Sequence, residues 1–187
     1  MINPVFDQNI FKILSLFSLA LGSRFTRKEI KEKAKLNNVP LDNSLLKLTK
    51  LEILKREGSY YSVNFENEDG KNIIQLLAKQ YKQLKEVPFD VYLILADISY
   101  NLSPIKGAEA YLFGSYSKLV YREDSDIDIA VLITKKLDKK FLKNQINRLE
   151  KVYRKNIEIH YFDKFNFYKN KKDPLIKEII KNGIRIV

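Results

Sequence analysis

The segment Tyr111–Ile133, YLFGSYSKLVYREDSDIDIAVLI, constrains the fold more than any other part of the chain. A short apolar run leads into the pair Gly114-Ser115, and after ten intervening residues Asp126–Asp128 opens a second apolar run that ends at Ile133. Short apolar runs bounded by turn residues are typical of buried strands, and a glycine between a strand and a helix permits a tight turn. The segment therefore predicts a strand, a glycine turn into a helix, and a central strand that begins with two carboxylates.

Asp126 and Asp128 are candidate metal ligands because side chains alternate along a strand, so that both would share one face. About 7 Å apart on that face, the two carboxylates would repel each other unless a cation lay between them. Mg²⁺ suits such a site because it takes hard oxygen ligands and leaves positions for phosphate oxygens and water. The pair therefore predicts a divalent-metal site. The apolar residues that follow disfavour the alternative, a solvated strand edge.

Gly114 and Ser115 would form the anion-binding side of the same site. A glycine turn lets backbone N–H groups approach a phosphate closely, and the dipole of the following helix favours negative charge. The Ser115 hydroxyl can donate to a terminal phosphate, and Lys118 can add positive charge one turn further on. We therefore predict Gly114, Ser115 and Lys118 as nucleotide-binding residues. Tyr116 and Tyr121, beside this turn, are candidates for stacking on a base or for self-modification.

A third carboxylate is expected in the strand predicted over Ile157–Phe162. Glu158 alternates there with apolar residues, so it would face the same cleft as the two aspartates if the strands are neighbours. It could bind the metal and accept the proton of an attacking hydroxyl group. Asp163 competes for this role from the strand end, where we expect it to start a turn instead. His160 shares the face of Glu158 and could touch a nucleotide or an acceptor, or simply pack at the edge of the site.

Residues 1–66 have the pattern of three helices followed by a β-hairpin. The first helix is expected over roughly Asp7–Leu21. The second is expected from Thr26, where TRKE has capping-box spacing, to the NNVP turn at Asn37–Pro40. A third helix then has one apolar face, formed by Leu41, Leu45, Leu48 and Leu51. ILKREGSYYSVNF predicts two strands around a turn at Gly58-Ser59.

This layout resembles a winged helix-turn-helix domain. In that family the third helix enters the major groove of DNA and the hairpin contacts the backbone. The resemblance implies four basic side chains as DNA contacts: Lys47, Lys50, Lys55 and Arg56. Contacts to phosphates need little beyond positive charge, and no residue of this segment dictates the recognition of a base. Winged helices also dock proteins and form dimers, so either use remains an alternative to DNA binding.

The remaining residues predict a linker and a second domain. Residues 67–88 would form a linker helix, over roughly Lys71–Lys85. Residues 89–187 alternate helices with strands, with helices expected over 89–101, 137–154 and 173–182. Lys164–Lys172, rich in lysine and asparagine, is expected to be an exposed loop. Strands that alternate with helices indicate an α+β (α/β-like) domain with helices on one face of its sheet.

The chain of 187 residues carries 34 lysines and arginines against 23 aspartates and glutamates, a net charge of +11. Such an excess favours a polyanionic partner, either nucleic acid or nucleotide phosphates. Residues 1–66 hold 11 basic and 7 acidic side chains, a net of +4, and residues 67–187 hold 23 and 16, a net of +7. Charge therefore singles out neither part for DNA binding, and a lysine-rich proteome would give the same balance.

The chain has no cysteine, which excludes disulfides and thiolate metal sites and fits a reducing compartment. The apolar stretch Ile13–Leu21 is too short to span a bilayer, and an amphipathic buried helix explains it better. With 45% hydrophobic and 30% charged residues, we expect a globular cytoplasmic protein without a membrane partner.

Gly114-Ser115, ten residues, and then Asp126–Asp128 is similar to the signature of the minimal nucleotidyltransferases of the DNA polymerase β superfamily. The closing DPLIKEIIKNGIRIV, Asp173–Val187, is also similar to the usual end of these domains. The resemblance implies a short mixed sheet backed by helices. It also implies that Asp126, Asp128 and Glu158 hold two Mg²⁺ ions and that Ser115 binds the β and γ phosphates. In-line attack on the α-phosphate would then transfer a nucleoside monophosphate and release pyrophosphate.

The same resemblance implies partners. Stand-alone minimal members often act as antitoxins that attach AMP, taken from ATP, to a HEPN-domain toxin. A nucleoside triphosphate and a HEPN-type protein are therefore expected partners, and the winged-helix resemblance of residues 1–66 adds DNA. One alternative is a DNA-binding regulator whose transferase domain senses a nucleotide, and another is transfer to a small molecule, as in aminoglycoside-modifying relatives.

Leu119 departs from the family pattern, which usually has a second glycine at that position, four residues after the serine. We expect the leucine to continue the helix and to crowd the triphosphate. This departure favours the regulator alternative.

Overall fold

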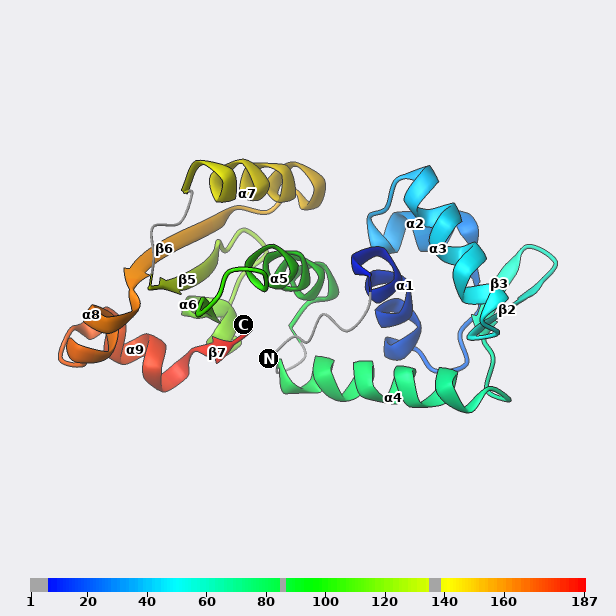
Figure 1. The fold of residues 1–187 in the computed structure, drawn as a ribbon, viewed down its shortest axis with the longest axis horizontal. Helices are drawn as coiled ribbons and strands as arrows, with labels where there is room; N and C mark the ends of the chain where they lie inside the picture. The colour runs from blue at the N-terminus through cyan, green and yellow to red at the C-terminus, as the bar shows by residue number, and fades with distance from the viewer. Residues whose placement is uncertain (1–6, 85–86, 135–138) are drawn as a thin grey trace. The chain divides into compact units, whose positions relative to one another are not determined.

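The computed structural model describes residues 7–84, 87–134 and 139–187, which fall into two compact units (Figure 1). The first unit ends at Gln83 and the second begins at Leu84. Along these described residues, no helix is both long and apolar enough to cross a membrane.

The first unit consists of helices around a small antiparallel sheet. Its elements are α1 (Gln8–Leu19), β1 (Phe25–Thr26), α2 (Arg27–Ala34), α3 (Asn38–Lys50), β2 (Leu54–Glu57), β3 (Tyr60–Val63) and α4 (Glu68–Gln83). Strand β3 lies between β1 and β2. Helix α4, predicted as a linker, belongs to this unit, and its predicted end at Lys85 lies outside the described residues.

Two local predictions for this unit are confirmed. The Thr26 backbone N–H donates to Glu29 Oε2 at 2.7 Å, and the Glu29 N–H donates to Thr26 Oγ1 at 3.3 Å, which makes the capping box that starts α2. The hairpin turns at Gly58-Ser59, because Glu57 and Tyr60 are paired across β2 and β3.

The third helix differs from its prediction at both ends. Helix α3 already begins at Asn38, so Pro40 lies in its first turn, where the missing N–H of proline costs no intrahelical hydrogen bond. Three of the four predicted apolar residues are buried, but Leu51 follows the end of the helix and is 61% exposed. Helical periodicity does not apply beyond Lys50, which explains the error at Leu51.

The second unit is a four-stranded mixed sheet with helices around it. Its elements are α5 (Phe89–Leu102), β4 (Glu109–Leu112), α6 (Gly114–Lys118), β5 (Ile127–Ile133), α7 (Lys139–Tyr153), β6 (Ile157–Asp163), α8 (Lys164–Lys169), α9 (Pro174–Asn182) and β7 (Ile184–Arg185). The strand order is β6-β5-β4-β7. Strand β5 runs parallel to β6 and antiparallel to β4, and this mixed α+β arrangement confirms the predicted fold class.

Helices lie against both faces of this sheet, whereas one covered face was predicted. Helix α7 lies over the face of β6 that carries Ile157 and Ile159 (Figure 1). On the opposite face, Ala130 and Leu132 of β5 pack with Phe167 of α8 and with two isoleucines of α9, Ile176 and Ile179. Helices α8 and α9 therefore cover only the part of this face around Ala130 and Leu132, and the end of β5 that carries Asp128 is less covered.

Lys164–Lys172 was predicted as a loop, and this prediction was wrong for its first six residues, which form α8. The Asp163 side chain accepts a hydrogen bond from the Asn166 N–H at 2.8 Å and so caps the new helix. Phe167 is 2% exposed and anchors the helix on the sheet. A single buried aromatic in a lysine-rich stretch gives too weak a periodic signal to predict so short a helix.

Candidate active site

The pairing of β5 with β6 brings two of the predicted carboxylates together. In this parallel ladder Asp128 is directly opposite Glu158, and Ala130 is opposite His160. Side chains of directly opposed residues lie on the same face of a sheet. The predicted placement of Glu158 beside Asp128 therefore agrees with the structure, while its role in catalysis stays a prediction.

Asp128, Glu158 and His160 form what we call the carboxylate–imidazole cluster. One ligand atom of each residue lies within 4.8 Å of the corresponding atoms of the other two. His160 Nε2 is 3.2 Å from Glu158 Oε1. Two carboxylates and one imidazole at this spacing are a donor set that fits a divalent cation.

Asp126 is exposed and immediately precedes β5. The alternation that predicted a shared face with Asp128 holds only within the paired strand, which starts at Ile127. Within the described residues, Asp126 is not part of the carboxylate–imidazole cluster. Its charge is nevertheless close enough to act on the ionisation of Asp128.

The pKa of Asp128 is raised above its ordinary value. Burial is the largest cause, and the negative charges of Glu158, Asp126 and Glu178 add to it, while His160 acts in the opposite direction. Several carboxylates that converge on one partly buried carboxyl group disfavour its ionised form unless a cation balances them. The electrostatics of this place therefore fit a bound divalent metal.

Gly114 packs directly against this cluster. Its φ is +69°, a conformation that L residues other than glycine rarely adopt, and a Cβ at this position would overlap the Asp128 carboxylate. The Phe113 N–H donates to the Asp128 backbone carbonyl at 3.0 Å, which holds the turn beside the start of β5. The predicted phosphate turn and the predicted metal ligand are therefore neighbours, because no side chain separates them.

Ser115 and Lys118 belong to the first and last turns of the short helix α6. Ser115 is half-buried, and its backbone carbonyl accepts a hydrogen bond from the Val120 N–H at 3.1 Å. Lys118 Nζ lies 2.5 Å from Glu178 Oε1 of α9. The predicted phosphate contact of Lys118 would therefore compete with an ion pair that is already formed.

Leu119 ends α6 instead of continuing it, so that expectation was wrong. Its φ of 59° and ψ of 32° are left-handed, and its backbone N–H donates to carbonyls of the preceding turn. A glycine would adopt this conformation without steric cost. The Leu119 side chain is 49% exposed. The glycine that the resemblance predicts at this position thus corresponds here to a helix-ending position of the backbone.

Tyr116 and Tyr121 stack on each other, with ring centroids 4.5 Å apart and an interplanar angle of 12°. Lys155 Nζ donates to the Glu123 carbonyl at 2.6 Å and to Tyr116 Oη at 3.4 Å. These contacts tie the segment between α6 and β5 to the start of β6. In this arrangement the two tyrosines support the segment that leads to Asp126.

The four predicted DNA contacts are all exposed side chains of the first unit. Lys55 Nζ lies 3.3 Å from Glu57 Oε1. Arg56 Nε donates to the Gly58 carbonyl at 3.0 Å, and its guanidinium group lies 5.6 Å from the centre of the Tyr61 ring. Lys55 and Arg56 therefore have structural partners within the hairpin, and DNA contact by Lys47, Lys50, Lys55 and Arg56 stays a prediction.

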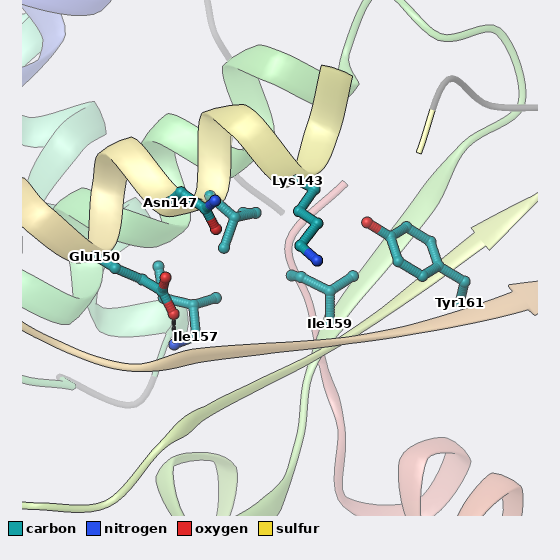
Figure 2. A pocket seen from close by; sticks show the side chains of 7 residues that line it. Lys143, Asn147, Glu150, Ile157, Ile159 and Tyr161 are labelled. Carbon is teal, nitrogen blue, oxygen red and sulfur yellow. Dashed lines mark hydrogen bonds between the residues drawn. The ribbon is translucent and has the colours of Figure 1, made fainter. Parts of the chain in front are cut away.

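A separate cavity of about 490 Å³ lies on the other side of β6, between this strand and α7 (Figure 2). Its floor is formed by Ile157, Ile159 and Tyr161, which alternate with Glu158 and His160 and so point away from the cluster. Figure 2 shows Glu150 of α7 at one end, where its Oε1 accepts the Ile157 N–H at 3.0 Å. The cavity is therefore not part of the carboxylate–imidazole cluster.

Sequence reasoning missed Glu178 altogether and left His160 without a firm role. Glu178 follows the Asp126–Asp128 motif by 50 residues, counted from Asp128. Only the packing of α9 beside α6 brings it near the site, and no local spacing indicates this. His160 could have been predicted as a ligand from the same alternation that predicted Glu158.

Comparisons with known proteins bear on the second unit. Residues 95–187 match the family model described as polymerase beta, nucleotidyltransferase. No curated protein matches the chain. Two solved structures match over 50% of this chain and 72% of theirs: a toxin–antitoxin with AMP-PNP (24% identity, TM-score 0.39) and a mutant of the toxin–antitoxin MntA-HpeT (21% identity, TM-score 0.38). The residues that match the family model include the whole carboxylate–imidazole cluster and Gly114.

Proposed function

Because residues 95–187 belong to the polymerase β nucleotidyltransferase family, we propose that this chain transfers AMP from ATP to a hydroxyl group of a protein partner. The proposal rests on the arrangement of residues where β4, α6, β5 and β6 meet. There, Asp128 and Glu158 lie side by side, and the Gly114 turn packs against the Asp128 carboxylate with no side chain between them.

Asp126, Asp128 and Glu158 are the proposed ligands of two Mg²⁺ ions. Burial, and then the neighbouring negative charges, raise the pKa of Asp128. The converging carboxylates fit such ions, because a cation relieves the part of this effect that comes from repulsion. When bound, Mg²⁺ would supply positive charge to phosphate oxygens. Gly114 and Ser115 are proposed to bind the triphosphate tail through the backbone of the turn and the serine hydroxyl.

Glu158 is the proposed general base. Its side chain is 59% exposed at the surface of β6, so that an acceptor hydroxyl can reach it from outside. Its carboxylate would accept the proton of that hydroxyl group as the oxygen attacks the α-phosphate of ATP and pyrophosphate leaves. Charge and position, rather than a covalent intermediate, are proposed to lower the barrier.

A protein acceptor is supported by the surface beside the site. The segment that joins α6 to β5 exposes three apolar side chains in a row: Leu119 (49%), Val120 (69%) and Tyr121 (36%). Contiguous exposed apolar residues next to a polar site are typical of surfaces that bind another protein. A HEPN-type protein is the partner that the family resemblance implies. A small-molecule acceptor would instead call for an enclosed polar pocket beside Glu158.

The proposal is tested by incubating the purified chain and a candidate HEPN-type partner with Mg²⁺ and each of the four α-labelled nucleoside triphosphates. We expect a labelled partner band with ATP, and Asp128→Asn should lower the labelling rate by about 100-fold or more. Asp124→Asn, a change of an exposed residue in the preceding loop, is the matched control and should label normally. Labelling by Asp128→Asn at the normal rate, or no labelling by any nucleotide, would contradict the proposal.

A DNA-binding regulator is the second candidate, supported by the exposed basic side chains at the end of α3 and in the hairpin of the first unit. In that case, the transferase domain would sense a nucleotide without turnover. Specific binding of operator DNA by a chain that transfers no label would favour this candidate.

A further inference from the structure

His160 lies in the carboxylate–imidazole cluster at the position of a ligand. Its ring nitrogen and the two carboxylates of Asp128 and Glu158 fit within 4.8 Å of one another. Asp126, the ligand that the family resemblance implies, is exposed and outside that group within the described part of the chain. The third donor that faces Asp128 and Glu158 is therefore an imidazole nitrogen.

The His160 ring is held in this orientation by its neighbours. The register of β5 and β6 fixes the residue on the same face as Glu158. The ring of Phe113, which is 5% exposed, contacts it edge to face, with centroids 5.2 Å apart and an angle of 70°. On the same ring, Nε2 lies 3.2 Å from Glu158 Oε1. The imidazole is therefore preorganised and half-buried, with its side chain 30% exposed.

We propose that His160 is a direct metal ligand and that, with Asp128 and Glu158, it makes a mixed nitrogen–oxygen site that selects Mn²⁺ over Mg²⁺. Mg²⁺ strongly prefers oxygen ligands and seldom accepts imidazole. Among the first-row divalent ions, Mn²⁺ is the one best suited to carboxylate and phosphate oxygens. It accepts an imidazole nitrogen beside those oxygens more readily than Mg²⁺, which demands oxygen ligands in near-ideal octahedral geometry. The inference rests on the proposed function and refines its metal: the site of Asp128 and Glu158 would bind Mn²⁺ more tightly than the Mg²⁺ that the family resemblance implies.

A purely structural role for His160 makes a different prediction. In that role the ring would donate from Nε2 to Glu158 and orient this carboxylate, and no nitrogen would touch the metal. Glutamine can also donate a hydrogen bond to a carboxylate, and its amide is a much poorer metal ligand than imidazole. His160→Gln therefore separates the two roles, because it removes the nitrogen ligand and keeps a donor near Glu158.

The chain has a single histidine, so any imidazole signal can be assigned to His160 without further labelling. We would load the purified chain, without a histidine tag, nucleotide or acceptor, with Mn²⁺ and record pulsed EPR. The expected result is a ¹⁴N coupling from a bound imidazole, which His160→Gln abolishes. Titration calorimetry of Mn²⁺ and Mg²⁺ should show that the ratio of their affinities falls by about tenfold or more in the variant.

Bound Mn²⁺ without ¹⁴N coupling, or an unchanged Mn²⁺ to Mg²⁺ ratio in His160→Gln, would overturn the inference. So would a wild-type chain that binds neither ion. Circular dichroism and the thermal unfolding midpoint show whether the variant is folded, and Asp128→Asn should lose the metal and the coupling together. Since these measurements need no turnover, a chain that binds Mn²⁺ through His160 but transfers no nucleotide would contradict the proposed function alone.

Discussion

Gly114 and Leu119 lie at the two ends of α6, and both have a positive φ, +69° and +59°. The two positions differ in what restricts a side chain there. At Gly114 the backbone conformation and the nearby Asp128 carboxylate both exclude a side chain, whereas the Leu119 side chain is half-exposed and meets only the cost of the left-handed backbone. That cost is about 1–2 kcal/mol for an L residue with a Cβ. The site is thus built on one position that requires glycine and one that tolerates a substitute.

Leu119→Gly should stabilise the chain. Relief of the left-handed strain outweighs the extra entropy that glycine has in the unfolded state, and we expect the free energy of unfolding to rise by about 0.5–1 kcal/mol. Ile180→Gly is the matched control, because Ile180 is similarly exposed, at 47%, but lies in right-handed helix α9. This control should lose about 1 kcal/mol. Urea unfolding measures both, and a loss in Leu119→Gly equal to that of the control would refute the argument.

Gly114→Ala should destabilise the chain more than the same change at a glycine with free space around it. Gly22 has a φ of +82°, and among the described residues no atom lies within 4 Å of the place that a Cβ would take there. Gly22→Ala therefore measures the backbone cost alone, about 1 kcal/mol. At Gly114 the overlap with Asp128 adds to that cost and displaces the carboxylate. Chemical unfolding and metal titration of both variants check this, and equal losses at the two positions would show that the overlap is unimportant.

At the scale of elements, the parallel pair β5 and β6 builds the site, and the sequence predicted it well. Asp128 pairs with Glu158, and the apolar residues on either side of each pair with one another: Ile127 with Ile157 and Ile129 with Ile159. A shift of one residue would move one apolar set to the other face, so burial of these isoleucines fixes the register that puts Glu158 beside Asp128. Prediction failed where contacts distant in sequence decide the outcome. Helix α8 forms because Phe167 meets the sheet, and Glu178 joins the site because α9 packs beside α6. Neither contact leaves a local pattern in the sequence.

Glu109 of β4 links its own strand to helix α8 and to strand β7. It accepts hydrogen bonds from Tyr168 of α8 at 2.5 Å and from Tyr111 at 3.0 Å, and it pairs with Lys164 at 2.7 Å and more loosely with Arg185 of β7. Burial by itself would raise the pKa of Glu109, but these partners outweigh burial and lower it to about 2. The ionised carboxylate therefore holds α8 and β7 to β4.

This cluster predicts a specific loss of stability in acid. The pKa of Glu109 is lower in the folded chain, about 2, than the ordinary value of 4.5, so its contribution is full above about pH 4.5 and is lost as the pH falls towards about 2. The gap in unfolding free energy between wild type and Glu109→Gln should shrink over this window. Glu123→Gln, at an exposed carboxylate, should show no such change. A gap that stays constant down to pH 2 would contradict the assignment.

At the scale of the whole molecule, both parts of the sequence carry an excess of basic residues, +4 in residues 1–66 and +7 in residues 67–187. The net of +11 favours anionic partners in general, and it does not distinguish triphosphate binding from DNA binding. Composition could therefore suggest the class of partner but not its place on the molecule. Where an anionic partner binds must be inferred from individual side chains. In the first unit, the exposed Lys47 and Lys50 at the end of α3 are the clearest candidates for contacts with DNA.

If the first unit binds DNA, replacing Lys47 and Lys50 together by alanine should weaken binding and make its dependence on salt shallower by about one to two released counterions. Lys79→Ala with Lys82→Ala on α4 removes the same charge from another exposed helix and is the matched control. Fluorescence anisotropy with a labelled duplex at several salt concentrations measures both. Equal effects of the two pairs would indicate general charge attraction, and no effect of either would exclude this contact surface.

The overlap between position 114 and the Asp128 carboxylate also affects how mutational surveys of this protein should be interpreted. A library screened only for soluble, well-folded protein will already reject nearly every replacement at Gly114, with no selection for chemistry at all. Intolerance there would thus reflect architecture as much as catalysis. Ser115 has no such positive φ, so it is the neighbouring position where a survey of activity and a survey of folding should disagree.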